Sequence, residues 1–186
     1  MSNIWFSSDY HFFHNKNFVY EPRGFSNIEE MNKVIIEKHN SLVQKDDEVY
    51  ILGDLMLNDN EGGLNCIKQL NGHLRIILGN HCTPTREQLY KTLSNVEGVQ
   101  LAAKLKYKGY HFFMTHYPCI TGNLEKESLK QMTLNLSGHT HSKEKFYQNM
   151  PFVYNVAVDA HDCYPVHIDQ IIEDIKAKVN ECKEML

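Results

Sequence analysis

Polar side chains with metal-binding chemistry recur at the ends of apolar runs in this sequence. In the stretch FSSDYHFFHNKN, Asp9, His11 and His14 follow such a run within a few residues of one another. Further candidates follow later runs: Asp54, Asn80, His81, His116, His139 and His141. Carboxylate, amide and imidazole groups offer only oxygen and nitrogen donors. Such a set suits Mn, Fe, Ni or Zn and does not require cysteine.

Each of these motifs is weak by itself. A D-x-H pair after a strand is commonly turn or surface chemistry, and GD and GNH are built from ordinary turn residues. GHTH is more specific, because two histidines two positions apart in an extended segment project to the same side. The ordered set is stronger than its parts, since α/β proteins gather ligands at the carboxyl ends of their strands.

The first half of the chain predicts strands that alternate with helices. The strands are expected at residues 3–9, 48–54 and 74–80, and the helices at 26–43, 64–72 and 83–93. Ser26 and Glu29 have the spacing of a capping box, and Thr83 precedes Pro84 as an N-cap precedes the first helical position. Gly72 is expected to end its helix.

The second half changes to a mixed pattern. Strands are expected at 100–108 and 110–116, joined by a hairpin at Gly109, and again at 133–139 and 152–159. A closing helix is expected from residue 168, with an apolar face made by Ile168, Ile171, Ile172, Ile175, Val179 and Cys182. The polar stretch 122–132 is expected to be a loop or a short helix.

The bulk composition narrows the class of protein. With 186 residues, residues 1–186 are expected to form a single domain. A net charge of −4 disfavours binding to an extended nucleic acid. No apolar run has the length of a membrane span, and the N-terminus lacks the pattern of a signal peptide, so a cytoplasmic protein is expected. In that compartment the five scattered cysteines are expected to be free thiols.

The ordered series D-x-H, GD, GNH, H and GHxH, from Asp9 to His141, resembles the calcineurin-like metallophosphoesterase superfamily. The opening SDYHFFH is similar to that of its small single-domain microbial phosphoesterases, with Phe13 where glycine is usual. The later stretch NVAVDAHDCYPVHIDQII is similar to the closing segment of that group. The resemblance implies an α/β fold in which two mixed β-sheets pack as a sandwich with helices on the outer faces.

The resemblance also implies a binuclear centre for two divalent metal ions, with manganese favoured and Fe, Ni or Zn as alternatives. One ion would be held by Asp9, His11, Asp54 and His141. The other would be held by Asp54, Asn80, His116 and His139. Asp54 would bridge the two ions, and a hydroxide shared by them would attack the phosphorus. His81, beside Asn80, is the expected general acid, and both residues are expected to contact the substrate.

Two residues of the first loop are further candidates for substrate binding. His14 lies one short turn beyond His11 and is able to face the substrate from the rim of the site. Arg23 is a candidate phosphate clamp, because a guanidinium group pairs with phosphate through two hydrogen bonds. A surface histidine and a solvated loop charge are the alternative interpretations of these two residues.

The leading functional hypothesis is a phosphodiesterase that acts on a small nucleotide or cyclic phosphate, as a monomer or homodimer without a membrane partner. A phosphomonoesterase, including a nucleotide or phosphoprotein phosphatase, would use the same metals. A nuclease ranks below these, because the chain is acidic and lacks a basic face interleaved with aromatic residues. A non-catalytic scaffold of the same fold is disfavoured by the complete set of ligand motifs.

Overall fold

The computed structural model describes residues 2–122, 126 and 128–184, and the elements below belong to that part of the chain. The strands are β1 (Ile4–Ser7), β2 (Glu48–Ile51), β3 (His73–Ile77), β4 (Val96–Gln100), β5 (Ala103–Tyr107), β6 (Tyr110–Met114), β7 (Thr133–Ser137), β8 (Val153–Asn155) and β9 (Val166–His167). The α-helices are α1 (Asn17–Tyr20), α2 (Ile28–Leu42), α3 (Asn60–Ile67), α4 (Pro84–Tyr90) and α5 (Ile168–Glu184). Short 3₁₀ turns lie at Glu21–Arg23, Tyr147–Asn149 and Val158–Ala160.

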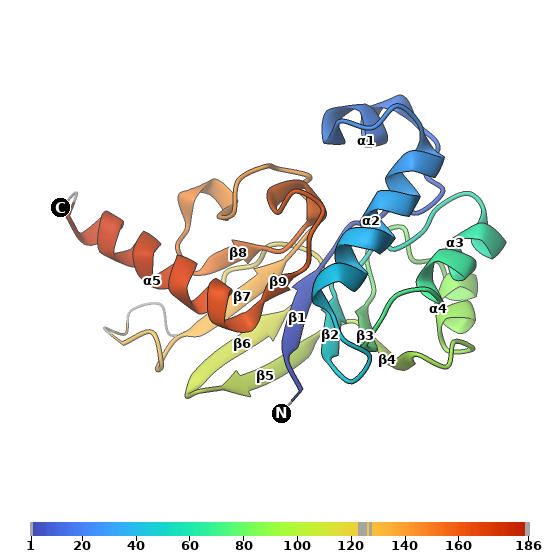
Figure 1. The fold of residues 1–186 in the computed structure, drawn as a ribbon. Helices are drawn as coiled ribbons and strands as arrows, with labels where there is room; N and C mark the ends of the chain where they lie inside the picture. The colour runs from blue at the N-terminus through green and yellow to red at the C-terminus, as the bar shows by residue number, and fades with distance from the viewer. Residues whose placement is uncertain (1, 123–125, 127, 185–186) are drawn as a thin grey trace.

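The strands form two mixed sheets that pack on each other (Figure 1). The first has the order β4-β3-β2-β1-β9, in which β1 to β4 are parallel and β9 is an antiparallel edge. The second has the order β5-β6-β7-β8, in which β5 is antiparallel to β6 and the others are parallel. The predicted α/β sandwich of two mixed sheets is therefore confirmed.

The central strands are buried on both faces. In β2, Val49 and Ile51 belong to an apolar cluster beneath the helices, whereas Tyr50 belongs to the cluster between the sheets. This alternation follows from the period of two of a strand, which turns successive side chains to opposite faces. Phe112 of β6 and Leu134 of β7 join the cluster between the sheets. The two clusters fix the separation and register of the layers.

The helices divide between the two clusters. Met31 of α2, Ile67 of α3 and Tyr90 of α4 lie in the cluster on the outer face of the first sheet, as predicted. The buried residues of α5 lie in the cluster between the sheets: Ile168, Ile171, Ile172 and Ile175. Helix α5 follows directly from the edge strand β9, so it packs beside the first sheet and against the inner face of the second.

Some element boundaries differ from the predicted ones. The N-cap of α2 is Asn27, whose side chain accepts from the Glu30 amide at 2.8 Å, one residue beyond the predicted Ser26 and Glu29 pair. Asparagine and serine are both good N-caps, so the pattern left the register open by one residue. The Thr83 cap of α4 is confirmed, with its hydroxyl accepting from the Arg86 amide.

Other differences concern short or weakly patterned segments. Helix α3 starts at Asn60 and ends at Ile67, before the predicted limits, and β4 had not been predicted. The hairpin at Gly109 is confirmed, and Lys108 and Gly109 both have positive φ, as a tight turn between twisted strands requires. Residues 123–125 and 127 of the expected loop or short helix at 122–132 lie outside the described residues.

Two further expectations concern the cysteines and membrane-spanning segments. The five cysteines are free, as predicted. Within the described part of the chain, none of the helices combines the length and the apolar character that crossing a bilayer would require.

Candidate metal centre

The candidate ligands lie where five strands end at one edge of the sandwich. Asp9 follows β1, Asp54 follows β2 and Asn80 follows β3 of the first sheet. From the second sheet, His116 follows β6 and the GHTH motif follows β7. The carboxyl ends of parallel strands share one edge of a sheet, and the two sheets bring their edges together. The predicted convergence of these motifs is therefore found in the structure.

Backbone hydrogen bonds hold the loops at this edge against one another. The amide of Asp9 donates to the carbonyl of Gly53 at 3.1 Å, and that of His11 donates to the carbonyl of Asp54 at 2.9 Å. Across the sheets, the amide of His139 donates to Asp9 Oδ2 at 2.9 Å. These bonds tie the loop after β1 to the loops after β2 and β7, so the side chains are held in place before any ligand binds.

The backbone at the site adopts conformations that most residues avoid. Five of the seven predicted ligands have φ between 50° and 71°: Asp9, His11, Asp54, His139 and His141. Left-handed backbone outside glycine is uncommon and persists where surrounding contacts impose it, often at functional sites. Phe13 also has φ 60°, so it keeps the conformation that glycine would favour at that position.

Two glycines allow the carboxylates to pack against main chain. A Cβ atom on Gly79 would lie 2.2 Å from Asp54 Oδ1. One on Gly138 would lie 2.2 Å from Asp9 Oδ2. Both separations are below van der Waals contact, so a side chain at either position would displace a candidate ligand. The glycines of the GN and GH motifs are thus explained by close approach.

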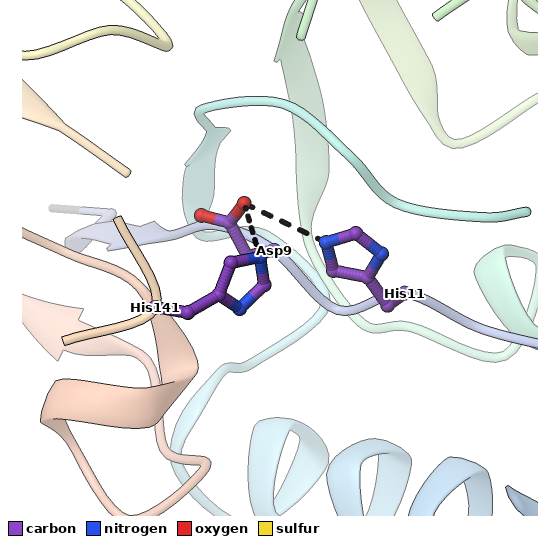
Figure 2. A group of neighbouring side chains, drawn as sticks. All are labelled: Asp9, His11 and His141. Carbon is purple, nitrogen blue, oxygen red and sulfur yellow. Dashed lines mark ion pairs between the residues drawn. The ribbon is translucent and has the colours of Figure 1, made fainter. Parts of the chain in front are cut away.

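The first ligand group consists of Asp9, His11 and His141 (Figure 2). Nε2 of His11 lies 3.8 Å from Asp9 Oδ1, and Nε2 of His141 lies 3.7 Å from the same oxygen. Asp9 Oδ1 and His11 Nε2 are buried, and neither has a hydrogen-bond partner among the described residues. Burying such atoms unpaired is costly. A cation between the three atoms would satisfy them, so the residues fit a metal ion.

The second group joins the two sheets through His116. Its Nε2 lies 3.3 Å from Asp54 Oδ2 and 2.8 Å from Asn80 Oδ1, while Nδ1 lies 2.7 Å from the Leu52 carbonyl. All three partners are acceptors, so the ring favours a proton on both nitrogens. His139 Nδ1 lies 2.9 Å from the same Asn80 oxygen. Acceptors gathered around a ring nitrogen also suit a cation in place of its proton.

The carboxylate common to the two geometric groups is Asp9. The groups are Asp9, His11 and His141, and Asp9, Asp54 and His116, with the ligand atoms of each within 4.8 Å of one another. The resemblance to the metallophosphoesterase superfamily implies that Asp54 is the bridge. Its Oδ1 accepts the His81 amide at 3.0 Å, and its Oδ2 faces His116. The bridging role of Asp54 stays a prediction.

Electrostatics at the site favour ionised carboxylates. Burial would raise the pKa of Asp54, but the His116 ring and the His81 amide together outweigh it and lower the pKa. Burial would likewise raise the pKa of Asp9, and the rings of His11, His141 and His116 lower it. Burial lowers the pKa of His11, which keeps that ring neutral. Ionised carboxylates and a neutral imidazole are the forms that bind metal ions.

The rings of His14, which was expected at the rim of the site, and of His81 both lie beside the first group. His14 Nδ1 is 3.1 Å from His11 Nδ1, and burial together with that neighbour lowers the pKa of His14 to about 4. The ring centroid of His81 lies 5.6 Å from that of His11 and 6.0 Å from that of His14. The three imidazoles therefore form one cluster.

Arg23 is buried and paired within the protein, whereas a phosphate clamp would leave its guanidinium free for the substrate. Its side chain is 2% exposed, and its Nε and Nη2 donate to the two oxygens of Asp159 at 2.9 and 2.8 Å. Nη2 also donates to the Asp9 carbonyl at 2.9 Å. The guanidinium is therefore committed to protein acceptors. The clamp prediction was wrong because an arginine in a polar loop can equally turn inward to a buried carboxylate.

Sequence reasoning missed Asp159. Its Oδ2 lies 3.1 Å from His141 Nδ1, on the side of the ring away from Asp9. Burial would raise the pKa of Asp159, but His141 and Arg23 hold it well below its usual range. The only signal in the sequence was the position of this aspartate inside NVAVDAHD, which no spacing rule connects to Arg23 or to GHTH.

Two exposed aromatic side chains flank the candidate centre. Phe18 is 71% exposed, and its ring centroid lies 5.6 Å from that of His14. Tyr117 is 51% exposed and lies 4.7 Å from His139 by the same measure. One aromatic ring thus adjoins each side of the candidate centre. Neither had been predicted as part of the site.

Comparisons with known proteins show relatives without an assigned activity. No protein-family model matches the sequence. The uncharacterized protein MJ1445 of Methanocaldococcus jannaschii is 32% identical over 191 residues, which cover 96% of this chain and 95% of that protein. The structure of AQ665 from Aquifex aeolicus, a protein of unknown function, matches with a TM-score of 0.71 at 22% identity, covering 93% of this chain and 99% of that one. This match shows a shared fold.

A more distant structure is that of YfcE, a phosphoesterase from E. coli. It has a TM-score of 0.48 at 16% identity and covers 83% of this chain and 78% of that one.

Proposed function

We propose that this chain, which belongs to the same family as MJ1445 of Methanocaldococcus jannaschii, is a metal-dependent phosphoesterase of the calcineurin-like superfamily. The observation that carries the proposal is the convergence of three ligand atoms, Asp9 Oδ1, His11 Nε2 and His141 Nε2, two of which are buried without a partner among the described residues. The strained backbone and the packed glycines around them support a site built for a ligand.

Two divalent ions are proposed for the centre. Asp9, His11 and His141 would hold the first, with Asp54 as the proposed bridge. Asn80, His116 and His139 would complete the second. Such a pair of ions, when bound, supplies charge that activates water and stabilises the phosphoryl oxygens. Manganese is the proposed metal, because oxygen and nitrogen donors without thiolate suit it, and Fe, Ni and Zn are the alternatives.

The protein's own residues would bind and orient the ester and move a proton. His81 is the proposed general acid, because its ring centroid lies 5.6 Å from that of the proposed ligand His11 and its imidazole would donate a proton to a leaving oxygen bound there. His14 is proposed to contact the substrate from the same side. Its lowered pKa makes it neutral near pH 7, so it would act by hydrogen bonding rather than by charge.

A diester is the proposed substrate in preference to a monoester. A phosphomonoester carries an additional negative charge and would gain from a further cationic side chain at the site. Arg23 was the candidate for that role, but it is buried and paired with Asp159. The exposed rings of Phe18 and Tyr117 support a ligand with a nucleobase, because bases stack on aromatic side chains.

The proposed activity can be tested with two matched esters. Metal-stripped protein is reloaded with Mn, Ni, Zn or Mg, and kcat/KM is compared for bis-p-nitrophenyl phosphate and p-nitrophenyl phosphate. We expect hydrolysis with at least one metal and a clear preference for the diester. Asp9→Asn, purified in the same way, controls for contaminating phosphatases. A preference for the monoester would favour a phosphatase over a diesterase. The absence of hydrolysis with all four metals would refute the proposed enzymatic activity.

A further inference from the structure

We propose that Asp159 and Arg23 are positioning residues that fix the proton of His141 on Nδ1 and so present Nε2 to the metal site. Asp159 contacts His141 through Nδ1, the ring nitrogen that does not face the metal site, and Arg23 holds the Asp159 carboxylate in place. The inference rests on the proposed function in one respect, namely that His141 binds a metal ion.

The Arg23–Asp159 pair is buried and geometrically matched. The side chains are 2% and 9% exposed, and the guanidinium donates to both carboxylate oxygens, from Nε at 2.9 Å and from Nη2 at 2.8 Å. Paired donors of this kind fix the plane of the carboxylate as well as its position. Asp159 Oδ2 is thereby held 3.1 Å from His141 Nδ1.

A count of hydrogens identifies the tautomer of His141. Arg23 Nη2 lies 3.3 Å from His141 Nδ1, so it is a second candidate partner for that nitrogen. Nη2 carries two hydrogens, and both are used in shorter bonds, one to Asp159 and one to the Asp9 carbonyl at 2.9 Å. None is left for the imidazole. The carboxylate can only accept, so Nδ1–H of His141 donates to Asp159, and in the neutral ring Nε2 therefore carries the lone pair.

That lone pair faces the first ligand group. His141 Nε2 lies 3.7 Å from Asp9 Oδ1, the oxygen that also faces His11. A carboxylate that accepts from the far ring nitrogen orients a metal-binding histidine and strengthens it as a donor. His141 needs such support more than His11, because its side chain is 41% exposed whereas that of His11 is 2% exposed.

The same pair connects His141 to the loop that carries Asp9. Besides its bonds to Asp159, Arg23 donates to the main-chain carbonyls of Asp9 and Tyr10 at 2.9 and 3.3 Å. Three segments distant in sequence thus meet at one guanidinium: the turn at Glu21–Arg23, the loop after β1 and the turn at Val158–Ala160. Arg23 therefore supports the first ligand group through Asp159 and through the main chain of the loop after β1, without facing the metal site itself.

The first test reads the tautomer directly. Ring nitrogen chemical shifts are recorded by ¹⁵N NMR on metal-free protein with labelled histidine, and the His141 signals are identified by their loss in His141→Gln. The spectra are recorded at a pH where the His141 ring is neutral, and we expect its single proton on Nδ1 in the wild type. A proton on Nε2, the other neutral form, would overturn the inference. This result does not depend on hydrolysis or on metal binding.

The second test measures metal affinity by titrating Mn²⁺ into stripped protein in a calorimeter. Asp159→Asn removes the charge that fixes the tautomer, and we expect the affinity to fall by about 10- to 100-fold. The matched control is Asp162→Asn, the same change at an exposed position in the same segment, which should bind as the wild type does. Unchanged affinity in Asp159→Asn would contradict the positioning role.

The two tests separate this inference from the proposed function. A wild-type protein that binds no metal but carries the predicted tautomer would refute the metal site and leave the Arg23–Asp159–His141 arrangement standing. Asp159→Asn leaves the buried Arg23 without its counter-charge, which is a destabilising change. If that variant does not fold, the wild-type tautomer decides the question alone.

Discussion

At the scale of the residue, His81 is held by its main chain while its ring lies among the imidazoles of the candidate site. Its amide donates to Asp54 Oδ1 at 3.0 Å, and Arg86 Nη1 donates to its carbonyl at 2.6 Å. The ring lies next to those of His11 and His14. A fixed backbone with a ring near the proposed ligands suits a group that transfers a proton.

Replacing His81 with alanine should therefore slow turnover without removing metal. We expect kcat on a diester with a poor leaving group to fall by about 10²- to 10⁴-fold, the range of general acid catalysis. The fall should be smaller on p-nitrophenyl esters, because that leaving group needs little protonation. Metal content is measured on the same samples. An unchanged rate on the poor leaving group would refute the role of His81 as the acid.

Asp54→Asn is the contrasting variant for that experiment. The carboxylate faces His116 and is the proposed bridge, so its neutral counterpart should lose metal and nearly all activity together. If His81→Ala loses turnover but retains metal, whereas Asp54→Asn loses both, His81 is distinguished from a metal ligand. Full activity in Asp54→Asn would instead favour Asp9 as the carboxylate shared by both ions.

At the scale of the element, α2 is anchored to the first sheet by a buried histidine in its last turn. His39 is 0% exposed, and its Nε2–H donates to the Asn71 carbonyl at 2.9 Å. Its Nδ1 accepts from the Tyr10 hydroxyl at 2.7 Å. Tyr10 lies between Asp9 and His11, so this contact also fixes the loop of the first ligand group. The bond from Tyr10 requires the neutral ring, because a protonated Nδ1 could no longer accept.

His39 should make stability fall as the pH falls. Burial lowers its pKa from 6.5 to about 4 in the folded protein. The unfolded chain then takes up the proton first, so the contribution is complete above pH 6.5 and is lost as the pH falls toward 4. We expect the free energy of unfolding to decrease by about 2 kcal/mol between pH 7 and pH 5 from this group.

The measurement is urea unfolding of wild type and His39→Gln at the two pH values, both with chelator present. Glutamine can donate to Asn71 and accept from Tyr10 without titrating, so the variant should lack that share of the pH dependence. Equal pH dependence in the two proteins would show that His39 is not responsible.

At the scale of the whole molecule, the proposed centre is shared by the two sheets. Asp9, Asp54 and Asn80 come from the first sheet, and His116, His139 and His141 come from the second. Ions bound there would link the sheets across one edge of the sandwich. The unfolded chain would not hold these six residues together, so metal binding should add to the stability of the folded state.

Removing metal should consequently lower the melting temperature. At a free metal concentration 100 times the dissociation constant, a single site adds about 2.7 kcal/mol, and melting should shift by several degrees. Differential scanning calorimetry of stripped protein with and without Mn²⁺ measures this shift. Asp9→Asn should melt at the same temperature in both conditions. A wild-type protein equally indifferent to Mn²⁺ would contradict a centre that spans the sheets.

The sequence alone determined the fold class and the positions of the candidate ligands. Apolar runs of strand length each ended in a metal-binding side chain, and parallel strands place such ends at one edge. The hairpin at Gly109 and the cap at Thr83 were equally local, because a turn or cap is specified by a few adjacent residues. The strand β4 and the one-residue shift of the α2 cap were not predicted, because their sequence patterns are short.

Only the tertiary structure decided which side chains share partners. Arg23 points inward to Asp159, which is 136 residues away in the sequence. The residues around Arg23 and around Asp159 give no indication of this contact. The same contact identified Asp159 as the carboxylate behind His141. Whether a polar side chain faces solvent or a distant partner depends on its burial and on the acceptors that packing brings near it. Those are properties of the assembled layers and not of any stretch of sequence.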